Sequence, residues 1–254
     1  MINYRPEKIG GMKLAVKVPS KIILDKSKSK KRVIHYVAMS LCENQLGKIF
    51  FTQNHLMELC GYQYKNAKAT SVSFEKLTEA LKQDGYIAYD KLHGNSKLVT
   101  ADKLKSMENP NHYAIIYPGD FVSIASFRSA LDHKASNKIT QTDLMLVLSY
   151  IRLRMFRSSN GSIYCADYIN NIAESIGETV WMVDNCVSIL NSLGIIYSEN
   201  LARYQIDGQW HTAKTIFVNV SDPNGGNNEN DYDCKKEMER AKKCFYNQTK
   251  EHKD

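Results

Sequence analysis

Two stretches of the sequence begin alike, Gly47-Lys48-Ile49-Phe50 and Gly161-Ser162-Ile163-Tyr164. A helical pattern follows each stretch and ends at a glycine, which is Gly61 in the first case and Gly177 in the second. A short apolar segment followed by helical periodicity is typical of a strand that leads into a helix. The offset of about 110 residues is longer than a solenoid repeat. The sequence therefore predicts one structural unit that is used twice.

A longer helical pattern follows in both copies and stops at Gly85 and at Gly194. Residues at equal distances before these two glycines are apolar in both copies: Leu81 and Leu190, Leu77 and Cys186, Phe74 and Val183, Val72 and Trp181. One face of each helix is therefore expected to be buried. We expect Trp181 to be a core residue like Val72, and the alternative is an exposed aromatic that contacts protein.

The order of predicted elements is the same in both copies. In the first copy it comprises helix 30–45, strand 49–51, a helix capped by Thr52, helix 66–84, strand 87–90, a turn region at 93–96 and return strand 112–117. In the second copy it comprises a helix capped by Thr140, strand 163–165, helix 169–176, helix 178–193, strand 195–198, a hairpin-type turn at Asp207-Gly208 and strand 215–220.

This order of elements is that of the winged helix-turn-helix, and residues 14–220 resemble a tandem winged-helix protein. The segments Val16-Lys17-Val18-Pro19 and Leu24-Asp25-Lys26-Ser27 resemble those that precede winged helices in plasmid and phage replication initiators. The expected fold is α+β, mainly α, with two winged helix-turn-helix domains in tandem. The resemblance implies binding to repeated sites at an origin and dimerisation through one domain.

The predicted organisation has four parts. These are a basic N-terminal arm (1–28), a first winged-helix domain (29–117), a second winged-helix domain (118–220), and a flexible linker with a charged tail (221–254). In the tail, Met238, Ala241 and Phe245 share one face of a possible helix. Two interpretations remain open for this tail, a short docking helix or a largely disordered segment.

The positive charge of the chain is concentrated near its beginning. The net charge is +7, and residues 1–35 contain ten Lys or Arg residues and only two acids. Such an arm favours a polyanion, either nucleic acid or an anionic membrane surface, although it can also serve solubility alone.

No apolar run approaches the roughly 18 residues of a membrane span. Residues 1–5 lack the apolar segment of a signal peptide, so we expect a soluble cytoplasmic protein without a membrane partner.

The second helix of a helix-turn-helix places its N-terminal residues against base edges in the major groove. In the first copy this position holds amides, lysines and hydroxyls that suit adenine, guanine and phosphate: Gln63, Tyr64, Lys65, Asn66, Lys68, Thr70 and Ser71. No acid lies between Glu58 and Glu75, which favours contact with DNA. The alternative is an ordinary solvated face.

Two further sets of residues are candidate contacts to the DNA backbone or minor groove. The end of the arm and the basic residues that lead from it into the first helix offer Lys28, Lys30, Lys31 and Arg32. The wing offers Lys91, His93, Asn95 and Lys97. Either set can equally be a solvated basic loop.

The second copy is less suited to DNA. The corresponding helix contains Glu178 and Asp184 together with Trp181. Acids repel phosphate, so we expect weaker DNA binding here and a candidate surface for a homodimer.

The arginines at 152, 154 and 157 lie at the end of a predicted helix, where they either complement the helix dipole, which we favour, or hold phosphate.

Motifs for catalysis or metal binding are missing from the sequence. It contains no P-loop, GxGxxG, GxSxG or HExxH, and its six cysteines form no CxxC pair. We expect buried reduced cysteines, no metal, no cofactor and no enzymatic activity.

The prediction is a sequence-specific double-stranded DNA-binding protein that acts in replication initiation of a plasmid or other mobile element. The alternatives are a winged-helix transcriptional regulator and a protein–protein interaction module without DNA binding.

Overall fold

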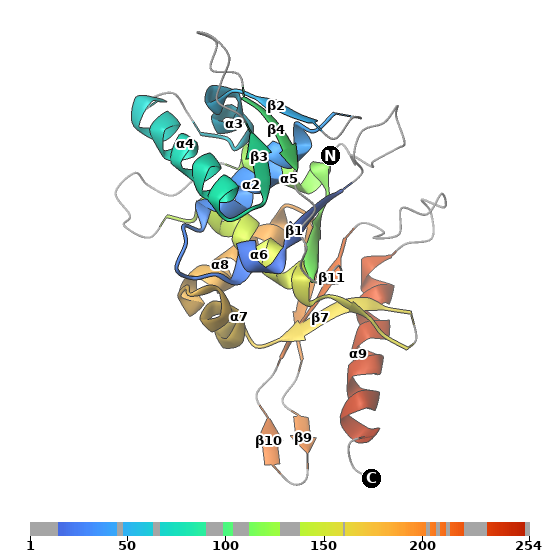
Figure 1. Cartoon of the computed structure of the whole chain (residues 1–254). Helices are drawn as coiled ribbons and strands as arrows, with labels where there is room; N and C mark the ends of the chain where they lie inside the picture. Colours follow the sequence, from blue (N-terminus) through green and yellow to red (C-terminus); the bar gives the residue numbers. More distant parts are fainter. Residues whose placement is uncertain are drawn as a thin grey trace. The chain divides into compact units, whose positions relative to one another are not determined.

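The computed structural model of the chain describes residues 15–44, 48–62, 67–89, 99–103, 112–127, 138–159, 161–201, 204–206, 209–211, 214–220 and 233–251. The structure is mixed α and β (Figure 1), which is compatible with the predicted α+β class. The chain divides into two compact units, Met1–Ser149 and Tyr150–Asp254. The division falls within helix α6 (Gln141–Arg154), and the predicted boundary between residues 117 and 118 lies inside the first unit.

The first unit is built around one buried helix. Its elements are β1 (Val16–Pro19), α1 (Ser20–Leu24), α2 (Lys31–Leu41), β2 (Lys48–Phe51), α3 (Gln53–Leu59), α4 (Ala67–Gln83), β3 (Ile87–Tyr89), β4 (Val99–Lys103), β5 (Tyr113–Ile116) and α5 (Pro118–Ser126). The sequence predicted one buried face for α2, and Ile34, Val37 and Ala38 of that face are fully buried. The expectation of a single buried face is wrong, because every residue from Arg32 to Ser40 is buried. Helix α2 contacts α1, α3, α4 and β2, so it forms the centre of this unit.

The three-stranded sheet of the first unit has the order β2-β4-β3 and is antiparallel. The predicted return strand at residues 112–117 is therefore wrong, because β4 returns between β2 and β3. Strand β5 pairs instead with β1, with Ile116 opposite Val16 and Ala114 opposite Val18. All four of these side chains are buried, so apolar burial explains the pairing. Strand β1 and helix α1 thus give regular structure to part of the predicted basic arm.

The second unit repeats this arrangement. After α6 its elements are β6 (Phe156–Arg157), β7 (Ile163–Asp167), α7 (Ile169–Ile176), α8 (Val180–Ser192), β8 (Ile196–Asn200), β9 (Tyr204–Ile206), β10 (Gln209–His211), β11 (Thr215–Asn219) and α9 (Cys234–Glu251). The main sheet has the order β6-β7-β11-β8, and β9 pairs with β10 on either side of residues 207–208. In both units, two strands flank a pair of helices in the sequence. A third strand, which comes later in the sequence, lies between those two strands in the sheet.

Helix α9 packs on the sheet of the second unit. Its buried side chains join those of β7 and β11 in one cluster that contains Tyr164, Leu201, Ile216, Val218, Met238, Ala241, Cys244 and Phe245. Lys242 of α9 also forms an ion pair with Glu199 of β8. Of the two interpretations left open for the tail, the docking helix is the one observed for residues 234–251.

Several predicted helix ends are confirmed. The Thr52 hydroxyl accepts a hydrogen bond from the His55 backbone N–H at 3.1 Å, and Gly61 and Gly177 have φ values of 78° and 72°. At the start of α6, Thr140 and Asp143 form reciprocal side-chain to backbone hydrogen bonds. Residues 142–152 of α6 are all buried, so this stretch of the helix has no exposed face.

Candidate nucleic-acid interface

Helix α4 begins where the sequence predicts contact with base edges. Its backbone starts at Ala67, so Lys68, Thr70 and Ser71 belong to its first two turns. The predicted residues Gln63, Tyr64, Lys65 and Asn66 lie outside the described residues. Further along α4, Phe74, Leu77 and Leu81 are buried, as the repeated pattern predicted. These side chains anchor α4 from Phe74 onward, and the first two turns of its backbone contain the candidate positions 68, 70 and 71.

The turn between α3 and α4 starts with a left-handed glycine. The backbone N–H of Gly61 donates to the Glu58 carbonyl at 2.9 Å, and that of Tyr62 donates to the Met57 carbonyl at 3.1 Å. These two bonds close the last turn of α3 in the manner of a Schellman motif, which requires a residue with positive φ. Because glycine adopts this conformation without a steric penalty, Gly61 ends α3 sharply ahead of α4.

A polar cluster lies in the core beneath these helices. His35 of α2 places its Nε2 atom 2.8 Å from the hydroxyl oxygen of Thr78 on α4, and Gln53 of α3 donates to the same oxygen at 3.2 Å. The Thr78 hydroxyl donates in turn to the Phe74 carbonyl at 3.0 Å. Burial of the imidazole lowers the pKa of His35 to about 3, so its ring is neutral at physiological pH. The cluster joins α2, α3 and α4 by hydrogen bonds.

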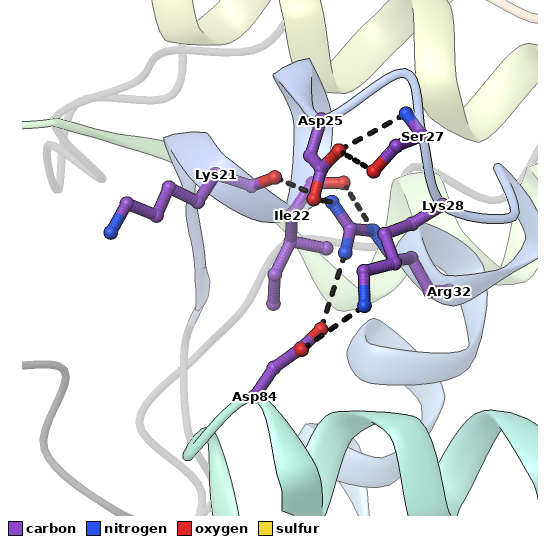
Figure 2. Close-up of polar contacts among 7 residues, drawn as sticks. All are labelled: Lys21, Ile22, Asp25, Ser27, Lys28, Arg32 and Asp84. Carbon is purple, nitrogen blue, oxygen red and sulfur yellow. Dashed lines mark hydrogen bonds and ion pairs between the residues drawn. The ribbon is translucent and has the colours of Figure 1, made fainter.

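Arg32 of the predicted arm is buried, with a side chain that is 5% exposed. Figure 2 shows its guanidinium between α1, the loop after α1 and the end of α4. The Nε and Nη2 atoms donate to the carbonyls of Ile22 and Lys21 at 3.1 and 2.6 Å, and Nη1 lies 3.5 Å from Asp84 Oδ2. The prediction that Arg32 contacts DNA phosphate does not fit this placement, because its donors are already used inside the protein.

The lysines of the arm also have partners within the first unit. Lys28 Nζ lies 3.4 Å from Asp84 Oδ1, and its side chain is 44% exposed. Lys30 Nζ lies 2.7 Å from Asp143 Oδ1, and Lys31 Nζ lies 5.8 Å from the centre of the Tyr62 ring. These contacts favour a structural role for part of the arm, while the half-exposed Lys28 keeps access to solvent.

The predicted wing residues Lys91, His93, Asn95 and Lys97 lie outside the described residues. They belong to the segment between β3 and β4, which are neighbouring antiparallel strands of the sheet. The sequence pattern predicted these wing residues between a strand at 87–90 and a strand at 112–117. The first of these strands is β3, but the strand that follows the wing residues is β4 and not the predicted one at 112–117.

The start of α8 differs from the expectation for the second copy. The prediction that Trp181 belongs to the core is wrong, because this side chain is 47% exposed and the preceding Val180 is 46% exposed. Thr179 caps the helix by accepting from the Met182 backbone N–H at 3.2 Å. This cap and the buried Val183 and Leu190 fix the helix, which turns Trp181 outward. The exposed aromatic that contacts protein was the alternative interpretation.

Arg152 lies in the last turn of α6, where the favoured helix-dipole interpretation placed it. It is buried, and its Nε atom donates to the Asn219 side-chain oxygen of β11 at 3.3 Å. This contact joins the end of α6 to the sheet within the second unit. A buried arginine that binds an amide oxygen supports packing of the unit.

All six cysteines are free thiols. Four of them are buried as expected, whereas Cys42 and Cys234 are half-buried. Burial raises the pKa of Cys42 to about 11 and that of Cys165 to about 12, and it also raises the pKa of Cys60. These thiols are therefore protonated at neutral pH, and their reactivity is low. In the part of the chain that the structure describes, no three His, Cys, Asp or Glu residues gather as a metal site.

Asp84 is the main site residue that sequence reasoning missed. It pairs with Lys28 and Arg32, which lie 56 and 52 residues earlier in the chain. No local pattern marks such a distant pair, and the only available signal was an acid directly before the predicted helix end at Gly85.

No helix of the described residues is long and apolar enough to cross a membrane. Comparison of the sequence with models of protein families gave no match, and comparison with curated proteins gave none either.

Proposed function

We propose that the chain is a sequence-specific double-stranded DNA-binding protein with two winged helix-turn-helix domains in tandem. The observation that carries this proposal is the repeated topology. Strand β2 precedes the helix pair α3–α4, β3 follows it, and β4 returns between them in the sheet. Strands β7, β8 and β11 stand in the same relation to the pair α7–α8. In a helix-turn-helix of this kind, the second helix of each pair is the one that reads DNA.

Helix α4 is the reading helix in this proposal. The residues from Leu59 to Phe74 include no acid, and Lys65 and Lys68 lie at or just before the first turn. Positive charge at the start of a helix favours phosphate, both through the side chains and through the free backbone N–H groups. The wing residues would follow the adjacent minor groove.

The proposed role is replication initiation of a plasmid or other mobile element, without bond-breaking chemistry and in the cytoplasm. Its support is the resemblance of residues 14–220 to tandem winged-helix initiators. A transcriptional regulator would read DNA in the same way. The arrangement of binding sites separates the two roles, because iterated sites at an origin indicate an initiator and sites over a promoter indicate a regulator.

Selection of bound duplexes from a random library, with the full chain as bait, tests the proposal. Recovery of a short shared motif would support sequence-specific binding. Failure to retain any duplex at physiological salt would contradict it and would favour the interaction module without DNA binding.

Salt dependence tests the assignment of α4. Each lysine that contacts a phosphate contributes about −0.9 to the slope of log Kobs against log salt, so Lys65→Ala and Lys68→Ala are each expected to reduce the slope by about one. Lys243 is exposed on α9 and provides a matched control, because Lys243→Ala removes the same charge in the second unit. An unchanged slope in both α4 variants would discard the assignment.

The second unit has a candidate function of its own, which is contact with protein. Trp181 and Val180 are exposed side by side at the start of α8, and Glu178 and Asp184 disfavour DNA there. Aromatic residues are enriched at protein interfaces, so we assign this surface to a homodimer contact.

A further inference from the structure

The Arg32 guanidinium joins segments that are distant in sequence. Two of its nitrogens donate to the carbonyls of Lys21 and Ile22 in α1. Two further contacts are ionic, with Nη2 at 3.6 Å from Asp25 Oδ2 and Nη1 at 3.5 Å from Asp84 Oδ2. Figure 2 shows that Asp84 comes from the end of α4, on the side opposite to Asp25 and α1.

The chemistry of these contacts requires arginine. The last carbonyls of a helix lack some of their partners within the helix, and Arg32 donates to two of them. The Lys21 carbonyl also accepts from the Asp25 backbone N–H at 3.2 Å. A guanidinium presents five donors in a fixed plane, and a lysine ammonium cannot reach the carbonyls and both carboxylates at once. Because the side chain is 5% exposed, water does not replace these partners.

Asp25 is itself held in place. Its carboxylate accepts a hydrogen bond from the Ser27 backbone N–H at 3.0 Å and another from the Ser27 hydroxyl. Hydrogen bonds from Ser27 and the positive charge of Arg32 lower the pKa of Asp25, so it stays ionised at neutral pH. The loop after α1 is therefore ordered by the same group of contacts that reaches α4.

We propose that Arg32 is a positioning residue that fixes the end of α4 against α1 through Asp84, so that DNA affinity depends on the Arg32–Asp84 pair although neither residue touches DNA. This inference rests on the proposed function. The first turns of α4 carry the candidate base contacts, and Asp84 lies just after the last turn of the same helix. A rigid helix transmits a shift at one end to the other end.

The charge of Asp84 makes the inference testable, because two effects of its removal have opposite signs. If electrostatics alone matter, loss of a negative charge strengthens binding to a polyanion. If Asp84 positions α4, its loss weakens binding. Asp84→Asn keeps the size of the side chain and removes only the charge. Glu75→Gln is the matched control, since Glu75 is exposed on α4 and loses the same charge.

The experiment measures the affinity of the full chain for the duplex recovered by the selection, over a series of salt concentrations. We expect Asp84→Asn to weaken binding about tenfold, within the range for residues that act through a packed network, with an unchanged salt slope. Glu75→Gln is expected to bind as well as the parent or slightly better. Asp84→Glu retains the charge and is expected to recover most of the affinity.

Arg32→Lys is the second variant to be measured in this experiment. It retains the charge but loses the planar fork, so we expect a similar loss of affinity and again the parental salt slope. A slope reduced by about one would instead indicate a phosphate contact by Arg32. Urea unfolding of each variant gives the folded fraction at the assay temperature, and affinities are compared per folded molecule.

The outcomes separate this inference from the proposed function. If the parent binds no duplex, the proposed function fails and the inference fails with it. If the parent binds DNA and Asp84→Asn binds equally well or more tightly, only the positioning role of Arg32 is overturned.

Discussion

His35 Nε2 lies 2.8 Å from the Thr78 hydroxyl oxygen, at the point where α2 and α4 meet. Because the Thr78 hydroxyl donates its hydrogen to the Phe74 carbonyl, it accepts from His35, which places the proton of the neutral ring on Nε2. The other ring nitrogen, Nδ1, is buried and has no hydrogen-bond partner among the described residues. A second proton on this ring would therefore be a buried charge without a partner.

The stability of the first unit is expected to depend on pH through His35. The folded chain lowers the pKa of this ring from 6.5 to about 3, whereas the unfolded chain retains the ordinary value. The unfolded state thus binds a proton that the folded state excludes. The free energy of unfolding should be highest above about pH 6.5 and should fall toward pH 3, with a slope near 1.4 kcal/mol per pH unit.

Urea unfolding at pH 7, 6, 5 and 4 measures this dependence. His35→Gln retains a polar side chain without titration in this range and is expected to flatten the profile. His55 is exposed on α3, so His55→Gln should leave the profile of the parent intact. Equal pH dependence in His35→Gln and the parent would contradict the assignment.

Lys30 is expected to contribute to stability rather than to DNA contact. Its ammonium lies 2.7 Å from the Asp143 carboxylate, which is nearly buried, while Lys30 itself is partly exposed. Lys30→Ala should reduce the free energy of unfolding by about 1 kcal/mol, the upper end for partly exposed pairs. The salt slope of DNA binding should not change. Lys26→Ala, in the exposed loop before α2, serves as the control for stability. A stable Lys30→Ala with a reduced slope would assign Lys30 to phosphate.

The exposure of Trp181 predicts a contrast within one helix. Trp181→Ala should change the free energy of unfolding by no more than about 0.5 kcal/mol, as is usual at exposed positions. Leu190→Ala, at a fully buried position of the same helix, should cost about 2–5 kcal/mol. If α8 forms the homodimer contact, light scattering should show a smaller mass for Trp181→Ala at concentrations where the parent is a dimer. An identical mass for both proteins would remove Trp181 from the interface.

Helix α9 is expected to be part of the stable second unit. Met238 is fully buried among β-sheet side chains that include Ile216 and Val218. Met238→Ala should cost about 2–5 kcal/mol in urea unfolding. Lys243→Ala, on the exposed side of α9, should have almost no effect. Similar stability of both variants would indicate that α9 does not depend on this packing.

The sequence predicted the elements that depend on local patterns. The helices that end at Gly61, Gly85, Gly177 and Gly194 were found because a glycine with positive φ and an apolar face mark a helix end within a few residues. The cap at Thr52 is equally local. Such signals depend only on residues that lie close to one another in the sequence.

Most of the errors concern pairs of segments that are distant in sequence, and the others concern burial that tertiary packing decides. Residues 112–117 were predicted as a strand, and only the buried partners Val16 and Val18 decide that this strand pairs with β1. Residues 99–103, which form β4, were not predicted as a strand. Arg32 was predicted to contact phosphate because it belongs to a run of basic residues. Such a run gives no sign that the carboxylate of Asp84, far away in the sequence, pairs with the guanidinium. Trp181 was assigned to the core because its counterpart Val72 is apolar, although tertiary packing decides burial at a helix start.

The buried thiols give each unit its own reporter of transient opening. Cys60 lies against the Ile34 carbonyl under α2, and Cys165 lies within the sheet of the second unit. Since a protonated, enclosed thiol does not react with an alkylating reagent, the rate of modification at each cysteine measures how often its surroundings open. Mass spectrometry of the labelled chain would then give the opening free energy of both units from a single unmodified sequence.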